Sequence, residues 1–401
     1  MSRVSWTPLF PQDEIPWLRE EARSFTLRRI AEMKKKKWSF SVENGLGSLI
    51  LYFHNLNFFM PHPEWKLFVE RGLDEVSAYD KYQYLSLYSG GLGSQWLLGL
   101  LTDKLPLAAQ SRTGSKNVSQ RLKDHVSAET DVDLVQGLAG IGVGLAQNPI
   151  SDCSLEFVVR RIFKLLVKSE LGGSFWPMVK RRGRRIRRDI APRADLGLAH
   201  GTPGVLTFLS FLRSADLADF SALRLSHMER VVDYLKAVDL RQQTRRYKNF
   251  GFFSDDPVSA RGRAAWCYGD PGVGFSLVAA GQAFHRKDWE AYGVAIALRG
   301  LDLKPSAGLI RLPYFCHGSV GLAHISARLF QMTNHKLFKE RADFWYRYSI
   351  AQYRKKPEHT MGLTGLHMHP LGLFHAWISG SIKVDPAWDS LFLLSAPGAK
   401  F

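Results

Sequence analysis

Apolar residues at helical spacing follow short glycine motifs along much of the chain. After Gly204, the apolar residues at 205, 206, 208, 209 and 212 share one helical face, and after Gly321 those at 322, 325 and 329 do the same. A glycine ahead of such a pattern supplies a tight turn and lets neighbouring backbone approach closely. The pattern predicts a series of helices that each begin at a glycine turn.

The glycine motif, G-x-x-G or close to it, recurs seven times. The copies are NGLG (44–47), GGLG (90–93), GLAG (137–140), GTPG (201–204), GDPG (269–272), GSVG (318–321) and GLTG (362–365). Their last glycines lie 46, 47, 64, 68, 49 and 44 residues apart. A period of about 45 residues fits two helices and their connections. Seven such pairs can close into an all-α, α/α toroid, and parallel inner helices would gather the seven turns at one end.

Composition agrees with a folded, helical chain. Of the 401 residues, 45% are hydrophobic, which supports a large core and excludes a mainly disordered chain. The three cysteines, at 153, 267 and 316, exclude a disulfide scaffold and fit a reducing compartment. Residues 1–21 hold no signal-peptide-like apolar stretch, and no later run approaches the roughly 18–20 apolar residues of a membrane span. We therefore expect a single cytoplasmic domain over residues 1–401, with no integral membrane segment.

The formal net charge of +17 is the unusual feature of the composition. Much of it lies in two runs, Lys34–Lys37 and Lys180–Arg188, and the second falls in a predicted loop at about 172–193. Such a run is either a solvated loop or a docking site for an anionic partner. No zinc finger, RNA-binding signature or heptad-bearing basic region accompanies it, so we expect no nucleic-acid partner.

Two cysteines occupy the same slot of neighbouring motif copies. Cys267 precedes the fifth copy, and Cys316 precedes the sixth together with His317. A Cys₂His set suits one zinc ion (Zn²⁺), because three protein ligands with an open fourth position are typical of a catalytic zinc site. The alternative is a pair of buried cysteines that act as small hydrophobes beside a hydrogen-bonded histidine.

Four further side chains with catalytic chemistry stand beside the motifs. By its pKa range, His200 is a candidate acid or base, and Asp133 can orient and charge its imidazole. Arg263 and Tyr268 can stabilise an oxyanion or enolate. The structural alternatives are a helix N-cap for Asp133, a packed turn histidine for His200 and a surface ion pair for Arg263.

The motifs DLVQGLAG, AHGTPG, WCYGDPG and CHGSVG resemble those of the lanthionine synthetase C-like family, from about residue 41 to about 376. The resemblance implies a toroid of seven inner and seven outer helices. It implies zinc-dependent cyclisation, in which peptide cysteine thiolates add to dehydroalanine or dehydrobutyrine and form (methyl)lanthionine rings. It assigns the zinc ligands to Cys267, Cys316 and His317, the acid/base pair to His200 and Asp133, and further active-site positions to Arg263 and Tyr268.

Two departures from the family concern its accessory domains. The surplus beside the fourth copy is about 18 and 22 residues, which allows a long loop but not the SH2-like insert that a family member carries. The chain is also too short for a fused dehydratase. We therefore expect a dehydrated precursor peptide as substrate, a separate dehydratase and an exporter as partners, and possible membrane association only through that complex.

Two other classes of protein remain as alternatives. One is a non-catalytic family member that binds peptides or glutathione. The other is a protein prenyltransferase β-like subunit, whose zinc ligands are Asp, Cys and His rather than the Cys, Cys and His present here. In the cyclase interpretation, the positive charge attracts an acidic leader segment of the precursor or an acidic face of the dehydratase.

Overall fold

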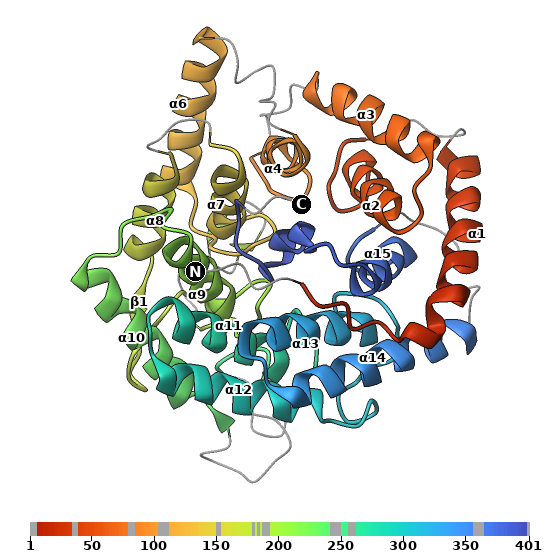
Figure 1. Ribbon diagram of the computed structural model, residues 1–401. Coiled ribbons are helices and arrows are strands. Elements are labelled where there is room, and N and C mark those ends of the chain that lie inside the picture. Colours follow the sequence, from red (N-terminus) through yellow and green to blue (C-terminus); the bar gives the residue numbers. More distant parts are fainter. Residues whose placement is uncertain are drawn as a thin grey trace.

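The computed structural model describes residues 6–33, 39–78, 85–102, 112–149, 154–178, 181–182, 185–186, 193–240, 250–255, 262–355 and 365–398. Within these ranges the chain is an α/α toroid (Figure 1). The inner ring consists of α2 (Leu46–Phe59), α4 (Gly91–Leu101), α7 (Leu138–Gln147), α9 (Thr202–Ser214), α11 (Asp270–Ala283), α13 (Ser319–Thr333) and α15 (Pro370–Ser381). The outer helices are α1 (Ile15–Met33), α3 (Pro63–Ser77), α6 (Arg112–Ala128), α8 (Ser154–Lys164), α10 (Ala222–Ala237), α12 (Lys287–Leu301) and α14 (Lys336–Lys355).

The inner ring is closed. Each inner helix contacts the next one along the chain, and α15 contacts α2. The outer helix that covers α15 is α1, from the other end of the chain, which follows η1 (Gln12–Glu14). The two ends of the sequence therefore complete the same part of the toroid.

Burial distinguishes the helices of the two rings. In α4, all residues from Gly91 to Leu100 are buried, because this helix has neighbours on every side. The outer helix α3 instead buries one stripe, with Trp65, Val69, Leu73 and Val76 at helical spacing. The nearly continuous apolar runs after the glycine motifs thus belong to inner helices.

A steric requirement explains the last glycine of the motif. A Cβ atom on Gly321 would lie 1.9 Å from the carbonyl oxygen of Phe315, six residues earlier, because the turn folds back over the first turn of the helix. The same contact would occur in the other repeats at Gly93, Gly140, Gly204 and Gly272, at 2.0–2.6 Å. A side chain at any of these positions would push the turn away from its helix.

The N-cap positions of the inner helices correct the register of two motif copies. In the seventh copy we expected GLTG (362–365), but α15 begins after the N-cap His369, and Gly372 makes the close approach, to the Leu366 oxygen at 1.8 Å. Residues 362–364 lie outside the described ranges. In the first copy the N-cap is Gly45, so Ser48 stands where the other copies have their last glycine. Spacing alone misplaced both because additional glycines stand nearby in each segment.

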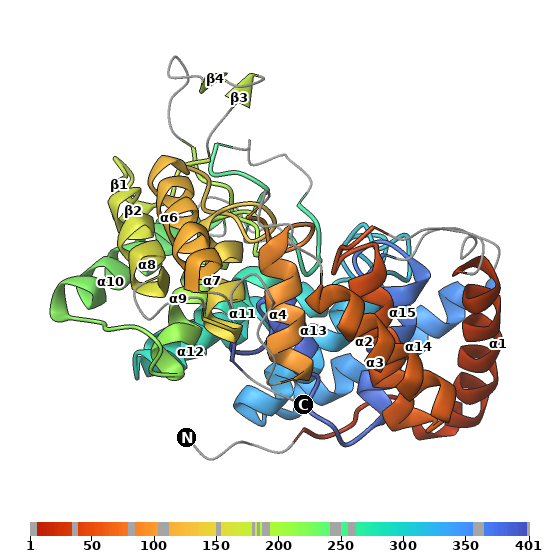
Figure 2. The ribbon, with the colours of Figure 1, turned by 90° about the horizontal axis from the view of Figure 1, so that it is seen from above.

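The long spacing ahead of the fourth copy holds the short strands. Strand β1 (Val167–Lys168) pairs antiparallel with β2 (Ser174–Phe175), and β3 (Arg181–Arg182) pairs antiparallel with β4 (Arg185–Ile186). Figure 2 shows β3 and β4 standing apart from the helices, beyond β1 and β2. The predicted basic loop at about 172–193 therefore contains a two-stranded arm. The other residues of the Lys180–Arg188 run, as well as Lys34–Lys37 and Cys153, lie outside the described part of the chain.

A short helix near the C-terminus, η4 (Ala387–Phe392), lies in the centre of the ring (Figure 1). Its backbone oxygens accept hydrogen bonds from Trp266 Nε1 to Phe392 (2.9 Å) and from Tyr88 Oη to Leu391 (2.7 Å). Asp389 of η4 is fully buried against His324 and Arg328 of α13. We call η4 with these two α13 residues the central plug, because it fills the middle of the toroid.

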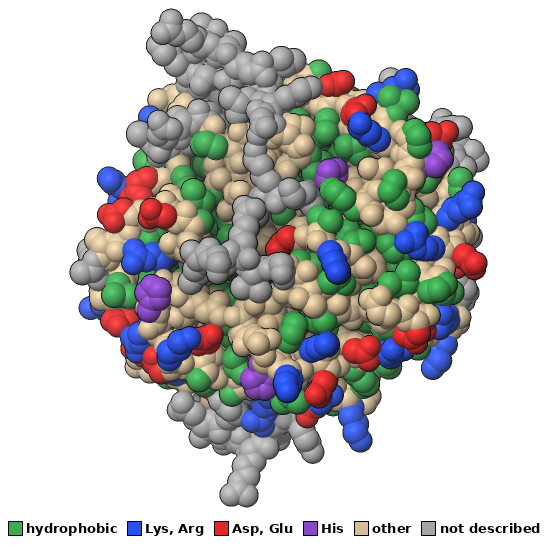
Figure 3. Space-filling model, viewed as in Figure 1, with side chains coloured by type: hydrophobic (Ala, Val, Ile, Leu, Met, Phe, Trp, Pro, Cys, Tyr) green, Lys and Arg blue, Asp and Glu red, His purple; other side chains and the backbone are tan. Residues whose placement is uncertain are grey.

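Among the residues that the structure describes, positive charge does not form one patch on the face shown in Figure 3. Lys and Arg side chains lie there among Asp and Glu side chains, mostly over the outer helices. Among the described residues, no helix is both long enough and apolar enough to cross a membrane.

Candidate metal and acid/base site

The turns that precede the inner helices lie side by side at one end of the ring. Backbone hydrogen bonds connect several of them in sequence. The donors and acceptors are Leu134 N to Ala199 O (3.1 Å), Ala199 N to Cys267 O (3.5 Å), Cys267 N to Cys316 O (3.3 Å) and Cys316 N to His367 O (2.8 Å). Residues up to 233 positions apart in the sequence (134 to 367) are thereby held on one ladder. The predicted site residues meet here because the ring brings their turns together.

The three predicted metal ligands form one cluster. The ligand atoms of Cys267, Cys316 and His317 all lie within 4.8 Å of one another. In a tetrahedral zinc site, ligand atoms about 2.0–2.3 Å from the ion are about 3.3–3.8 Å apart, so only small side-chain movements are needed. The hydrogen bond from Cys316 lowers the pKa of Cys267 against the effect of burial, and His317 and Arg263 lower it further. Two thiols and an imidazole in this environment can hold a metal ion.

The predicted acid/base pair is formed by adjacent turns. His200 Nδ1 lies 2.9 Å from Asp133 Oδ2, and because a carboxylate only accepts, Nδ1 carries the proton and Nε2 is left for other partners. Asp133 Oδ1 also accepts from the backbone N–H groups of Gln136 (2.7 Å) and Gly137 (2.8 Å), ahead of α7. The carboxylate thus caps its own turn as well as orienting the imidazole.

His200 combines accessibility with a raised pKa. Its side chain is 41% exposed, so a substrate can reach it. Burial of the rest of the ring lowers its pKa, but the hydrogen bond and charge of Asp133, with the charges of Asp195 and Cys267, outweigh this and raise the pKa above its usual value. His200 therefore carries a proton more readily than a free histidine does.

Tyr268 is hydrogen-bonded to Asp195, a residue that the sequence did not single out. Its hydroxyl donates to Asp195 Oδ2 at 2.8 Å, and its ring centroid lies 6.1 Å from that of His200. Asp195 is only 2% exposed. It stands six residues before the N-cap of α9, the same distance at which Arg263 precedes the N-cap of α11. Alignment of the repeats by their N-caps would have placed Asp195 and Arg263 in one slot.

Arg263 faces the thiol cluster. Its charge lowers the pKa of Cys267, and its Nε atom is buried without a hydrogen-bond partner in the described part of the structure. The N-cap Gly269 explains this placement, since its φ of +95° and the approach of the Arg263 oxygen leave no room for a Cβ. Arg263 is thus not the surface ion pair of the structural alternative.

Comparison with known proteins identifies the family and the fold. The family model for lanthionine synthetase C-like protein matches residues 36–375. The chain belongs to the lanthionine synthetase C-like family. Among solved structures, nisin cyclase is similar at a TM-score of 0.74 and 16% sequence identity, over 94% of this chain and 97% of that chain. At this identity the likeness establishes the α/α toroid fold.

In this lanthionine synthetase C-like chain, a second His–carboxylate pair lies on the other side of the thiol cluster. His367 Nδ1 is 3.4 Å from Glu43 Oε1, and the contact lowers the pKa of Glu43. The His367 ring packs against Tyr88 and Trp266. In the corrected register, His367 occupies the slot that Cys267 and Cys316 occupy in their repeats.

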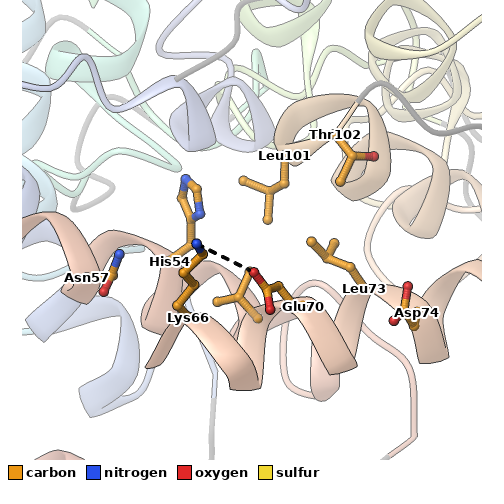
Figure 4. A pocket seen from close by; sticks show the side chains of 9 residues that line it. His54, Asn57, Lys66, Glu70, Leu73, Asp74, Leu101 and Thr102 are labelled. Carbon is orange, nitrogen blue, oxygen red and sulfur yellow. Dashed lines mark ion pairs between the residues drawn. The ribbon is translucent and has the colours of Figure 1, made fainter. Parts of the chain in front are cut away.

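Two cavities in the structure lie away from the candidate site residues. One, of about 600 Å³, is lined by α2, α3 and the end of α4, including His54, Leu101 and the Lys66–Glu70 ion pair (Figure 4). The other, of about 520 Å³, is lined by residues of α1, α2 and α3. Neither cavity contains a candidate site residue.

Proposed function

We propose that this chain is a zinc-dependent lanthipeptide cyclase, which forms thioether rings in a dehydrated precursor peptide. The observation that supports it best is the meeting of the Asp133–His200 pair and the Cys267–Cys316–His317 cluster on adjacent turns of one ladder. Neither group alone accounts for a reaction. Together they provide a place to acidify a thiol and a group to move the proton.

The three ligands fit one zinc ion because their donors are two sulfurs and one nitrogen, a set that zinc favours. Zinc bound there supplies Lewis-acid activation, which lowers the pKa of a peptide cysteine thiol. Cys267 and Cys316 themselves then act as ligands and not as nucleophiles.

The reaction we propose is an intramolecular Michael addition. The peptide sulfur forms a bond to the β-carbon of dehydroalanine or dehydrobutyrine, and the π electrons of the double bond move toward the adjacent carbonyl as an enolate. His200 donates a proton to the α-carbon, and Asp133 stabilises the protonated form of its imidazole. Arg263 stabilises the negative charge that develops before this protonation. The proton lost by the thiol is thus replaced at carbon, and the peptide mass does not change.

The substrate of this reaction must already contain dehydrated residues. We therefore propose that a separate dehydratase supplies the precursor and that the full toroid over residues 1–401 acts on it. The positive charge of the chain attracts acidic segments of the precursor or of the dehydratase.

Incubation with a dehydrated, cysteine-containing precursor tests the proposal. Before alkylation, the mass of the peptide should be the same with and without enzyme. After thiol alkylation, mass spectrometry should show fewer alkylated cysteines in the sample with enzyme. Free cysteines at the no-enzyme level would exclude cyclisation of that substrate. Tight binding of the peptide without thiol loss would instead indicate a non-catalytic peptide-binding protein.

A further inference from the structure

Asp195 is a buried carboxylate that none of the proposed steps uses. Its Oδ1 accepts from the Gly197 backbone N–H (2.8 Å) and its Oδ2 accepts from the Tyr268 hydroxyl (2.8 Å). Its backbone oxygen accepts from Thr202 N at the start of α9 (3.0 Å). The carboxylate is therefore fixed on the segment that leads to His200, and it contacts the turn that carries Cys267.

The neighbouring residues pack closely around the Asp195–Tyr268 pair. A Cβ on Gly197 would lie 2.8 Å from Cε1 of the Tyr268 ring, and a Cβ on Gly201 would lie 2.6 Å from Asp195 Oδ1. On the other side, Phe252 packs edge-on against the Tyr268 ring, with centroids 5.0 Å apart. Side chains at either glycine would displace the tyrosine or the carboxylate.

The hydrogen bond between the two residues has a definite direction. Burial raises the pKa of Asp195 to about 6, against the hydrogen bonds from Gly197 and Tyr268 and the charge of His200, so the group is ionised at pH 8. The Tyr268 hydroxyl lies 2.8 Å from Asp195 Oδ2 and donates its proton to it. A carboxylate can only accept, and a phenol has a single proton to donate. The Tyr268 oxygen is then left with lone pairs alone for any other partner.

We infer that Asp195 is a positioning residue that fixes the Tyr268 hydroxyl as a hydrogen-bond acceptor toward the precursor peptide. The inference rests on the proposed cyclase function. Tyr268 in this state accepts a backbone N–H of the peptide segment beside the reacting residue, close to His200. An oxygen that presents only lone pairs does not stabilise an enolate, so this role belongs to Arg263 and not to Tyr268.

Asp195→Asn reverses the direction of the hydrogen bond. The oxygen of the new amide still accepts from Gly197 N, and its NH₂ group donates to the Tyr268 oxygen, which turns the phenol proton outward. Tyr268→Phe removes the acceptor altogether. At pH 8 the kcat of Tyr268→Phe should stay within twofold, whereas that of Asp195→Asn should fall, because the Asp195 charge helps to raise the pKa of His200. We expect each variant to raise the KM for the dehydrated precursor by about three- to tenfold, since one hydrogen bond to substrate is lost. The double variant should resemble the single ones, because both changes remove the same contact.

Three results would overturn the inference: a wild-type KM in Asp195→Asn, a wild-type KM in Tyr268→Phe, or effects that multiply in the double variant. Asp255→Asn, at an exposed position near the same segment, is the matched control and should leave KM unchanged. Zinc content and Tm show whether each variant folds, and if Asp195→Asn does not, Tyr268→Phe alone decides.

A wild-type protein that does not cyclise the precursor refutes the proposed function instead. The Kd for the dehydrated precursor then tests Asp195 separately, and equal Kd values for the wild type and both single variants would reject its role.

Discussion

Within the described ranges, two Asp–His pairs have nearly equal lengths and opposite character. His200 Nδ1 lies 2.9 Å from Asp133, and His324 Nε2 lies 2.8 Å from Asp389 in the central plug. The first pair is partly exposed at the turns, whereas both side chains of the second are fully buried. The pKa of His200 is raised, and that of His324 is lowered.

The second partner of each carboxylate explains part of the difference. Asp389 also accepts from Arg328 Nε (2.6 Å), so its charge is already neutralised, and burial keeps His324 uncharged. Asp133 receives backbone N–H groups besides His200, so its charge remains available to an imidazolium. The same two residue types thus form a candidate proton donor at one place and a structural contact at the other.

Loss of a metal ligand should have the largest effect. Cys267→Ala or Cys316→Ala leaves two ligands, so we expect loss of bound zinc and of cyclisation, while the central plug stays intact. Elemental analysis and thermal unfolding of the purified variants measure this. Full zinc occupancy in either variant would contradict the ligand assignment.

His200→Ala should separate the two pairs in activity. We expect cyclisation to slow by about 10²–10⁴-fold, the contribution of a general acid, with zinc content unchanged. His324→Ala should not change the chemical step in this way if the variant remains folded. Cyclisation rates in single-turnover experiments provide the comparison, and an unchanged rate for His200→Ala would remove its assigned role.

Asp389→Ala should show that the buried Asp–His pair matters for stability. It leaves the Arg328 charge buried without its main partner, which costs about 3–5 kcal/mol in the free energy of unfolding. The control is Asp13→Ala, which breaks an exposed pair with Arg347 and should destabilise the fold far less. Denaturant unfolding measures both, and equal small losses would show that the plug is not held by this network.

Lowering the pH should reduce the free energy of unfolding first through the buried histidines. His375 of α15, fully buried near His324, His54 and Asp389, has a pKa well below its usual value because of burial. A group with a lowered pKa in the folded state binds more protons when unfolded, so stability falls as the pH drops below about 6.5, by about 1.4 kcal/mol per pH unit for each such histidine.

Replacing His375 should reveal its share of that slope. Both of its ring nitrogens lack hydrogen-bond partners in the described structure, so His375→Leu removes the titration without breaking a hydrogen bond. We expect the slope of unfolding free energy against pH to decrease by that one increment. His200 acts in the opposite sense, since its raised pKa gives stability that is lost as the pH rises. An unchanged slope in His375→Leu would contradict this assignment.

Salt should have the smallest effect, and only on surface charge. The Debye length falls from about 10 Å at 0.1 M salt to about 3 Å at 1 M. If the net charge of +17 attracts an acidic leader segment, affinity for the full-length precursor should weaken several-fold over this range. A precursor with a neutral leader is the control. Affinity that stays flat would mean that charge does not recruit the precursor.

The sequence was sufficient for the ring of helices because its glycines are sterically required. Gly93, Gly140 and Gly321 each meet a carbonyl oxygen that excludes a Cβ, so the repeat is visible in residue identities. The seventh copy was misplaced because its N-cap is His369 rather than glycine, and GLTG nearby mimics the motif.

The candidate site was less accessible from sequence alone. Cys267 and Cys316 could be paired because they share one slot of adjacent repeats, and the structure brings them together with His317. Asp195 and Glu43 could not be paired with their partners in this way, because Tyr268 and His367 belong to other repeats. These contacts depend on which turns lie next to each other in the closed ring. The central plug was also missed, since no repeat pattern indicates that η4 fills the ring.

Closure of the toroid by the two ends of the chain has a consequence for biosynthesis. Trp6 Nε1 donates to Ser379 O and Phe10 N donates to Gly380 O, so the segment ahead of α1 binds one that is translated some 370 residues later. Contacts of such high sequence separation form late in folding. A nascent chain must keep α1 without its final partner until α15 has left the ribosome, and we expect chaperones to recognise this stage. Truncation shortly before α15 should therefore yield an aggregation-prone protein and not a smaller ring.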